Sequence, residues 1–300
     1  MEKEAWVYIS GDGVEYPLDV DGKRTVLTSE GTGIPEIKYI SKRGPYQDGD
    51  SISAYRLEPR IVQLLIRHNF CDRRAYWTGR QELISILRPN RSIYPGTLRK
   101  VRIDGSKRDL NVYILEGPKF VSNDPKMWDE WGFTEPLRFQ ASNPVAYEPT
   151  RNVVRVVSQA YMHVILPMTL PHILGDWVLD RNAVITYLGD WPEYPTIRIH
   201  GPINKPTITN LSTGKKLSLD VVLTDTETVD IVLTYGTKTV TKNSGDNYIS
   251  YLTSDSDLAT FCIEPDPVVT GGINTIQVAG TDTEVATYVE IYYYNRYLGY

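Results

Sequence analysis

The sequence predicts a mainly β protein, and three stretches carry this prediction. Residues 194–219 read as strand, Gly-Pro turn, strand, Thr-Gly turn and strand, with Ile197 and Ile199 alternating with polar residues. Residues 286–294 alternate in the same way and form the strongest strand pattern of the chain. Only residues 72–87 show the spacing of a convincing helix. We therefore expect β-sandwich-type domains with one helix.

The composition is that of a globular protein long enough for two domains. Of 300 residues, 41% are apolar and 23% charged, and no apolar run is long enough to cross a membrane. The 21 tyrosines against 5 phenylalanines favour large, half-buried contact surfaces, because a tyrosine ring packs while its hydroxyl stays hydrated. The N-terminus has no signal-peptide core. We expect no membrane partner.

Residues 1–143 are predicted to form the N-terminal domain. Its strands are expected within residues 1–43 and over residues 51–68, 97–103, 110–116 and 133–140. In the long strand over residues 51–68, apolar side chains occupy one face at Val62, Leu64 and Ile66. This pattern is typical of a sheet packed on a core. The polar residues 44–50 before it form a loop with hairpin chemistry.

The helix of this domain has two alternative starts. A capping box can begin it at Thr78, or Asp72 can cap a longer helix that tolerates Gly79 at a cost of about 1 kcal/mol. Pro89 ends the helix in both cases.

Residues 144–193 are predicted to connect two domains, and residues 194–300 to form a second one. The connection begins at Asn143-Pro144, in a stretch dense in turn residues, and is long enough for an extra hairpin. After residue 200 we expect no helix. Further short strands are predicted over residues 229–234, 237–241, 248–252, 258–263 and 273–278. Their spacing is typical of a β-sandwich.

Charge is distributed unevenly along the chain. The net charge is −5, yet residues 200–300 carry a net −6, and residues 55–108 carry a net +9. The basic segment is either a set of solvated or ion-paired arginines, or a surface that meets an acidic neighbour or DNA.

The sequence offers no convincing catalytic or metal-binding motif. The four histidines, His68, His163, His172 and His200, have no metal-ligand spacing, and the two cysteines, Cys71 and Cys262, are far apart in the sequence. Asp19 and Asp21 begin an EF-hand-like pattern that Gly22 interrupts. The acidic pairs Asp129-Glu130 and Asp255/Asp257 fall in polar loops. We expect no catalytic residue, no cofactor and no metal, and hence no enzyme.

Three aromatic residues are candidates for stacking on sugars. Trp177, Trp191 and Tyr194 lie beside turn sequences near the start of the predicted sandwich. The alternative is that these rings pack between domains, which is the more common role of such residues.

Several motifs, in order and spacing, resemble the distal tail proteins, which are baseplate hub components of long-tailed, non-contractile bacteriophages (siphophages). They are Gln47-Asp48-Gly49, Arg60-Ile61-Val62, Arg80 to Pro89, Asn143-Pro144 with Tyr147, Ile199-His200-Gly201, Thr207 to Leu211, Thr213-Gly214, Ile273-Asn274 and Asn295-Arg296-Tyr297. The chain departs from the family in its long segment over residues 151–193, and in Gly271-Gly272, which replaces a Pro-Gly.

The resemblance implies a homohexameric ring at the tail tip of a virion. The N-terminal domain would form the ring around the tail channel, with DNA only as cargo, and a galectin-like C-terminal domain would project outward. The implied partners are the chain itself, the tail tube protein, a tail-tip or tail-associated protein, and receptor-binding or fibre proteins. The protein would be made in the host cytoplasm. Complementary charge between the basic segment and the acidic domain could join subunits.

Two other functions fit the same sequence. A carbohydrate-binding adhesion module that recognises the host surface would use the aromatic residues named above. A tail-tube or tape-adjacent ring protein would share the N-terminal fold, although the complete C-terminal sandwich argues against it.

Overall fold

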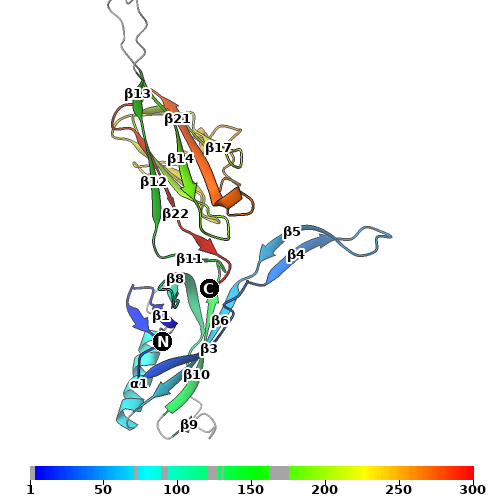
Figure 1. Cartoon of the computed structure of the whole chain (residues 1–300), viewed down its shortest axis with the longest axis vertical. Coiled ribbons are helices and arrows are strands. Elements are labelled where there is room, and N and C mark those ends of the chain that lie inside the picture. The colour runs from blue at the N-terminus through cyan, green and yellow to red at the C-terminus, as the bar shows by residue number, and fades with distance from the viewer. Residues whose placement is uncertain (1–3, 71–72, 89–93, 120–127, 130–131, 162–175) are drawn as a thin grey trace, which may run out of the picture. The chain divides into compact units, whose positions relative to one another are not determined.

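The computed structural model describes the chain except for residues 1–3, 71–72, 89–93, 120–127, 130–131 and 162–175. It divides into two compact units (Figure 1). The first unit comprises Met1–Pro149 together with Tyr297–Tyr300, and the second comprises Thr150–Arg296. The second unit therefore begins and ends at other residues than the predicted second domain. Residues 150–193 belong to the second unit, and the last four residues return to the first.

The first unit is built on one antiparallel sheet with the strand order β2-β1-β7-β8-β10-β6-β3. These strands are β1 (Ala5–Ile9), β2 (Glu15–Pro17), β3 (Arg24–Glu30), β6 (Arg60–Asn69), β7 (Gly96–Val101), β8 (Lys107–Glu116) and β10 (Gly132–Ala141). Short strands β9 (Trp128–Asp129), β11 (Ala146–Tyr147) and β23 (Arg296–Tyr297) join it at the side. The ring of Tyr8 on β1 stacks on that of Phe139 on β10, 5.7 Å away between centroids. These strands are not neighbours, so the sheet curls around a shared core.

Helix α1 (Arg73–Ile86) packs on that core. Its Leu83 and Ile86 are buried with Val62 and Leu64 of β6, whose alternation was predicted from the sequence. The helix follows the longer of the two predicted alternatives. Thr78 is an interior residue, because its hydroxyl donates to the carbonyl oxygen of Arg74, 3.1 Å away, instead of capping a helix start. Asp72 and Pro89 lie outside the described residues.

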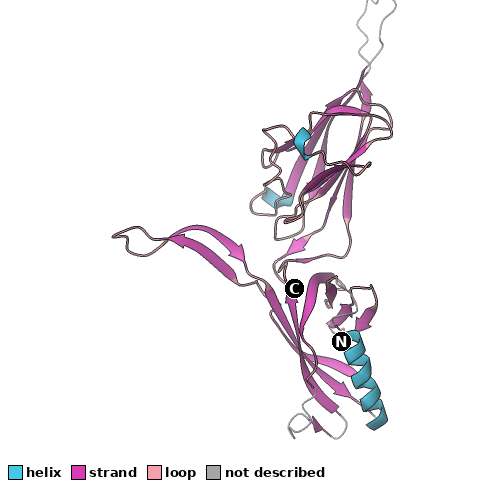
Figure 2. Cartoon of the chain, turned by 180° about the vertical axis from the view of Figure 1, so that it is seen from behind, coloured by secondary structure: helices cyan, strands magenta, loops and turns pink. Residues whose placement is uncertain are grey.

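The predicted strand over residues 51–68 is two strands with different roles. β5 (Ser51–Leu57) pairs only with β4 (Ile37–Lys42), whereas β6 begins at Arg60 and lies inside the sheet. Pro59 separates them, and a proline supplies no N–H to continue a ladder. The β4–β5 hairpin projects from the first unit as a long arm (Figures 1 and 2).

The second unit is a β-sandwich of two antiparallel sheets. One has the order β12 (Asn152–Val157), β22 (Tyr288–Tyr293), β15 (Thr196–His200), β19 (Thr228–Val232) and β20 (Thr239–Lys242). The other has the order β13 (Gln159–Tyr161), β14 (Asp176–Thr186), β21 (Ile273–Thr281), β16 (Ile203–Asn210) and β17 (Lys215–Ser218), with β18 (Val222–Leu223) beside β16. The core between them contains Ile197 and Ile199, as their alternation predicted.

The segment predicted as a connection is part of this sandwich. β12 pairs along its whole length with β22, and residues Leu179 to Thr186 of β14 pair with β21. Two predicted strands are not seen: residues 249–251 form a 3₁₀ turn (Ile249–Tyr251), and the stretch over residues 258–263 contributes one bridge residue, Ile263.

The C-terminal tail completes the core of the first unit. Tyr300 is buried, its ring stacks on that of Trp6 at 5.2 Å, and its hydroxyl donates to the carbonyl oxygen of Leu98. The buried guanidinium of Arg60 donates to the carbonyl oxygen of Leu298. The second unit is thus inserted between Pro149 and Tyr297 of the first.

Candidate functional site

The acidic pair Asp255 and Asp257 has a structural role. Asp255 accepts hydrogen bonds from Lys216 Nζ and from the Thr253 hydroxyl, and these interactions lower its pKa to about 2. Asp257 accepts a hydrogen bond from the backbone N–H of Lys216, at 3.0 Å. Among the described residues, no cluster of three or more His, Cys, Asp or Glu side chains could hold a metal. Glu130, His163 and His172 lie outside them.

The other titratable candidates are tied into the fold. Asp19 accepts the backbone N–H groups of Trp6 and Val26 at 3.0 and 2.9 Å, so it links the starts of two strands. The Cys262 thiol is free and buried, and burial raises its pKa to about 12, which keeps it protonated and unreactive. Cys71 lies outside the described residues. Among the described residues, no helix is long and apolar enough to cross a membrane.

The β4–β5 hairpin is the first notable surface. Tyr39 and Tyr55 sit opposite each other in its ladder, and each is 57% exposed. Ile37 lies on the same face as these rings, and Ile40 and Ile52 add further exposed apolar area. Isolated two-stranded hairpins are marginally stable in water. A hairpin this exposed and this apolar is typical of a surface that another chain covers.

The loop at the tip of the hairpin is held in one shape by its own hydrogen bonds. Gln47 is the centre of this shape: its side-chain oxygen accepts the Gly44 N–H at 3.0 Å, and its side-chain nitrogen donates to Ser51 Oγ at 2.8 Å. Tyr46 has a φ of 65°, in the left-handed region that is costly for a tyrosine, and its side chain is fully exposed. The loop therefore displays an aromatic ring away from the protein.

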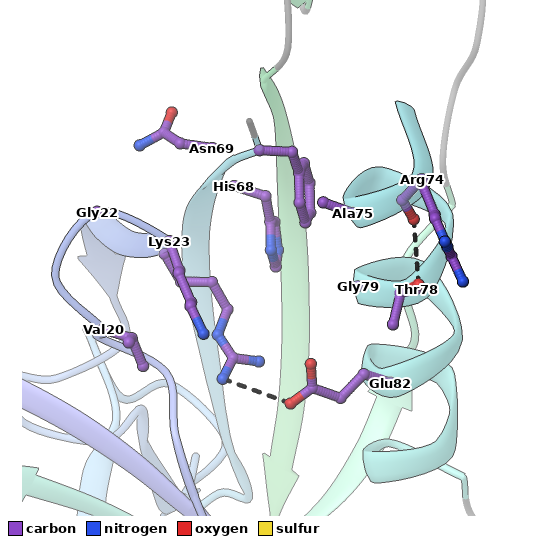
Figure 3. A pocket seen from close by; sticks show the side chains of 12 residues that line it. Val20, Gly22, Lys23, His68, Asn69, Arg74, Ala75, Thr78, Gly79 and Glu82 are labelled. Atoms are coloured by element: carbon purple, nitrogen blue, oxygen red, sulfur yellow. Dashed lines mark hydrogen bonds and ion pairs between the residues drawn. The ribbon is translucent and has the colours of Figure 1, made fainter. Parts of the chain in front are cut away.

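The second notable surface is a cavity of about 570 Å³ in the first unit (Figure 3). Helix α1 forms one wall, the end of β6 forms another, and the turn leading into β3 closes the third side. Phe70 supplies an aromatic wall, parallel to the His68 ring at 6.1 Å and edge-on to Tyr76 at 5.7 Å. Gly79 makes room for this ring, because a Cβ there would lie only 2.8 Å from Phe70 Cζ.

The cavity is electropositive. Among the described residues, Lys23, Arg24 and Arg74 line it with one acid, Glu82, which lies 3.9 Å from Arg24 in a long ion pair (Figure 3). His68, 2% exposed, adds no charge at neutral pH, since burial and the nearby Arg24 lower its pKa to about 4. No acidic side chain among the described residues pairs with Lys23 or Arg74. The cavity can therefore receive an anionic group beside an aromatic wall.

The predicted sugar-stacking residues do not form one group in the described structure. Trp191 is half-buried, and its N–H and carbonyl oxygen bond to Arg296 and Tyr187. Tyr194 packs against the core of the second unit, 6.2 Å from the Tyr235 ring and 5.0 Å from Lys238 Nζ. The side chain of Trp177 lies outside the described residues. Sugar stacking by these three residues stays a prediction.

The sequence predicted the hairpin loop over residues 44–50, but neither the separation of its two strands from the main sheet nor the cavity. The arm had a signal, because Pro59 interrupts the strand pattern and the Gly44 to Asp50 turn makes its two sides adjacent. The cavity had none, because its walls come from three segments whose proximity follows only from the tertiary fold.

Comparisons with known proteins follow this geometry. No protein-family model matches the chain, and no curated protein sequence matches it significantly. Among solved structures it is similar to SPP1 Dit (gp 19.1), described as a paradigm of the hub adsorption apparatus in phages that infect Gram-positive bacteria. The TM-score is 0.63 at 13% identity, and the match covers 97% of this chain and 98% of that one. The phage p2 baseplate in its activated conformation matches with a TM-score of 0.45 at 9% identity, over 97% and 98% of the two chains. The chain has the fold of the distal tail protein SPP1 Dit.

Proposed function

We propose that this protein is a distal tail protein, a structural hub of a phage baseplate, and that it performs no catalysis. The first unit forms a homohexameric ring that joins the tail tube to the host-adsorption apparatus. The fold similarity to SPP1 Dit over nearly the whole chain supports the class of protein. The observation that carries the assembly is the β4–β5 hairpin, whose exposed tyrosines and isoleucines contact no core of their own chain.

In this proposal the second unit is a galectin-like domain that docks other baseplate or receptor-binding proteins. Its two-sheet sandwich supports this role, because such a domain offers broad faces and end loops instead of a deep pocket. The hub would be located at the tail tip of the virion.

The test removes the aromatic pair of the hairpin. Tyr39→Ser together with Tyr55→Ser removes the two exposed rings that face each other in the ladder while leaving both protein cores intact. We expect the wild-type chain to sediment as a hexamer and to form six-fold rings in negative stain. The variant should stay monomeric, with a free energy of unfolding within about 0.5 kcal/mol of wild type, as is usual for exposed positions.

Tyr235→Ser is the matched control, because Tyr235 is an exposed tyrosine of the second unit. It should assemble like the wild type. A wild-type chain that remains monomeric at every concentration, and never joins purified tails, would contradict the proposed function.

A further inference from the structure

The cavity between α1 and β6 is built before any partner arrives. Phe70 lies between His68 and Tyr76, and the missing side chain of Gly79 leaves room for its ring in the cavity wall. The volume of about 570 Å³ is that of a site for a few side chains, not for a domain face. Its occupant should therefore be a short segment that carries negative charge and an apolar or aromatic group.

The chain itself contains such a segment, the hairpin tip over residues 44–50. Asp48 and Asp50 give residues 44–50 a net charge of −2, and Arg43, which directly precedes them, donates from Nε to the Gln47 carbonyl oxygen at 3.3 Å. Tyr46 projects fully exposed from it, and the hydrogen bonds of Gln47 fix the loop in shape before binding. A preorganised loop loses little conformational entropy on docking. Its charge and its aromatic ring complement the basic, Phe70-lined cavity.

The loop cannot use the cavity of its own chain as the first unit is folded. The hairpin and α1 lie on opposite sides of that unit in both views (Figures 1 and 2). A contact between opposite sides of identical subunits is heterologous, and heterologous contacts that close generate rings. The arrangement of the two surfaces is therefore the one that a ring requires.

We propose that loop 44–50 of one copy enters the cavity between α1 and β6 of the next copy. The Asp48 and Asp50 carboxylates meet Lys23 and Arg74, and the Tyr46 ring lies against Phe70. This inference rests on the proposed function, because it needs copies of the chain to assemble, and it names the receptor site for the arm. It makes assembly both directional and dependent on ionic strength.

A charge swap in the full-length chain tests the pairing. Lys23→Glu with Arg74→Glu reverses the cavity, and Asp48→Lys with Asp50→Lys reverses the loop. Each pair alone should raise the concentration at which half the chains are assembled by at least tenfold, measured by analytical ultracentrifugation. All four substitutions together should restore assembly to within threefold of wild type, because the opposite charges meet again.

Arg102→Glu with Lys107→Glu is the matched control, because it makes the same charge change as the cavity variant at the β7–β8 connection, and neither residue lines the cavity or belongs to the loop. It should assemble normally. The loop variant alters only exposed residues, so it keeps the test valid even if reversal of the cavity impairs folding.

The outcomes separate this inference from the proposed function. Wild-type rings together with equally good assembly of the loop variant would show that the docking site is wrong while the hub role stands. The same holds if the chain with all four substitutions assembles no better than either pair. If wild type never self-associates, both are wrong.

Discussion

Burial sets the protonation state of His68. The side chain lies on β6 behind the cavity, next to the Arg24 cation, and both effects lower its pKa to about 4 from an unfolded value near 6.5. The folded chain therefore holds a neutral imidazole at pH values where the unfolded chain already binds a proton. This pKa could not be predicted from the sequence, because a histidine in an alternating strand pattern can face either side.

This difference predicts a pH-dependent stability. As the pH falls from 6.5 toward 4, the unfolded chain binds a proton at residue 68 that the folded chain does not bind. The free energy of unfolding therefore decreases. Between pH 7.5 and 4.5 the loss at this residue should be about 2 to 3 kcal/mol. Urea unfolding of wild type and His68→Gln at the two pH values measures it. Wild type should lose that much more stability than the variant, and equal losses would show that His68 is not responsible.

Helix α1 shows which features of an element a sequence can and cannot reveal. Its spacing predicts one apolar face of Leu83, Ile84 and Leu87. Leu83 and Leu87, the latter one residue past the helix end, are buried, whereas Ile84 is 50% exposed, so the prediction was wrong for Ile84. Its start was ambiguous, because the capping box at Thr78 and the longer alternative are equally good local patterns. In the long helix Phe70 packs beside Gly79, and that contact exists only in the tertiary structure.

The same contact predicts the effect of Gly79→Ala. Alanine is the better helix former by about 1 kcal/mol, so the substitution would stabilise an isolated helix. Here the new methyl group would lie too close to the Phe70 ring, which His68 and Tyr76 confine. We expect a net loss of about 1 to 2 kcal/mol from overpacking, measured by thermal unfolding.

Phe70→Leu should relieve the clash. The double variant Gly79→Ala with Phe70→Leu is then expected to lose less stability than the two single changes combined. Additive effects of the two substitutions would argue that the residues do not compete for space.

At the scale of the whole chain, the local patterns predicted a sandwich over residues 194–300, whereas the second unit comprises Thr150–Arg296. Residues 153–157 and 184–188 have strand-like patterns, which cover β12 but only the end of β14, and nothing local shows that these strands pair with β22 and β21 near the other end of the chain. The return of the C-terminal tail was equally hidden. Tyr300 reads as one more tyrosine, and its place beside Trp6 depends on contacts almost three hundred residues apart.

The insertion of the second unit predicts two deletions with opposite results. Ending the chain at Pro149 removes Tyr300 from the first core, and should cost about 3 to 5 kcal/mol, the usual loss for deleting a large buried aromatic side chain. Replacing residues 150–296 by a short Gly-Ser linker keeps Tyr300 in place. The linker can be short, because the Tyr297 hydroxyl lies 2.7 Å from Glu148, next to the other end of the gap.

Thermal unfolding of the two shortened chains gives the comparison. The linker variant should unfold at a clearly higher temperature than the truncated chain. The same variant with Tyr300→Ala should fall back to the level of the truncated chain. Equal unfolding temperatures for the linker variant and the truncated chain would contradict a stabilising role of the tail.

The hairpin arm also affects how prone the unassembled protein is to aggregate. Within the described residues β4 and β5 pair only with each other. Both outer edges of this hairpin therefore have backbone groups that a strand of another chain can pair with. Lys38 and Arg56 face each other across it, and a bulge between Ile40 and Ser41 distorts the ladder. Charges and bulges of this kind discourage open-ended strand addition. The newly made chain can thus expose the β4–β5 hairpin without polymerising into fibrils. Replacing Lys38 and Arg56 by threonine would remove the two charges and favour such polymerisation.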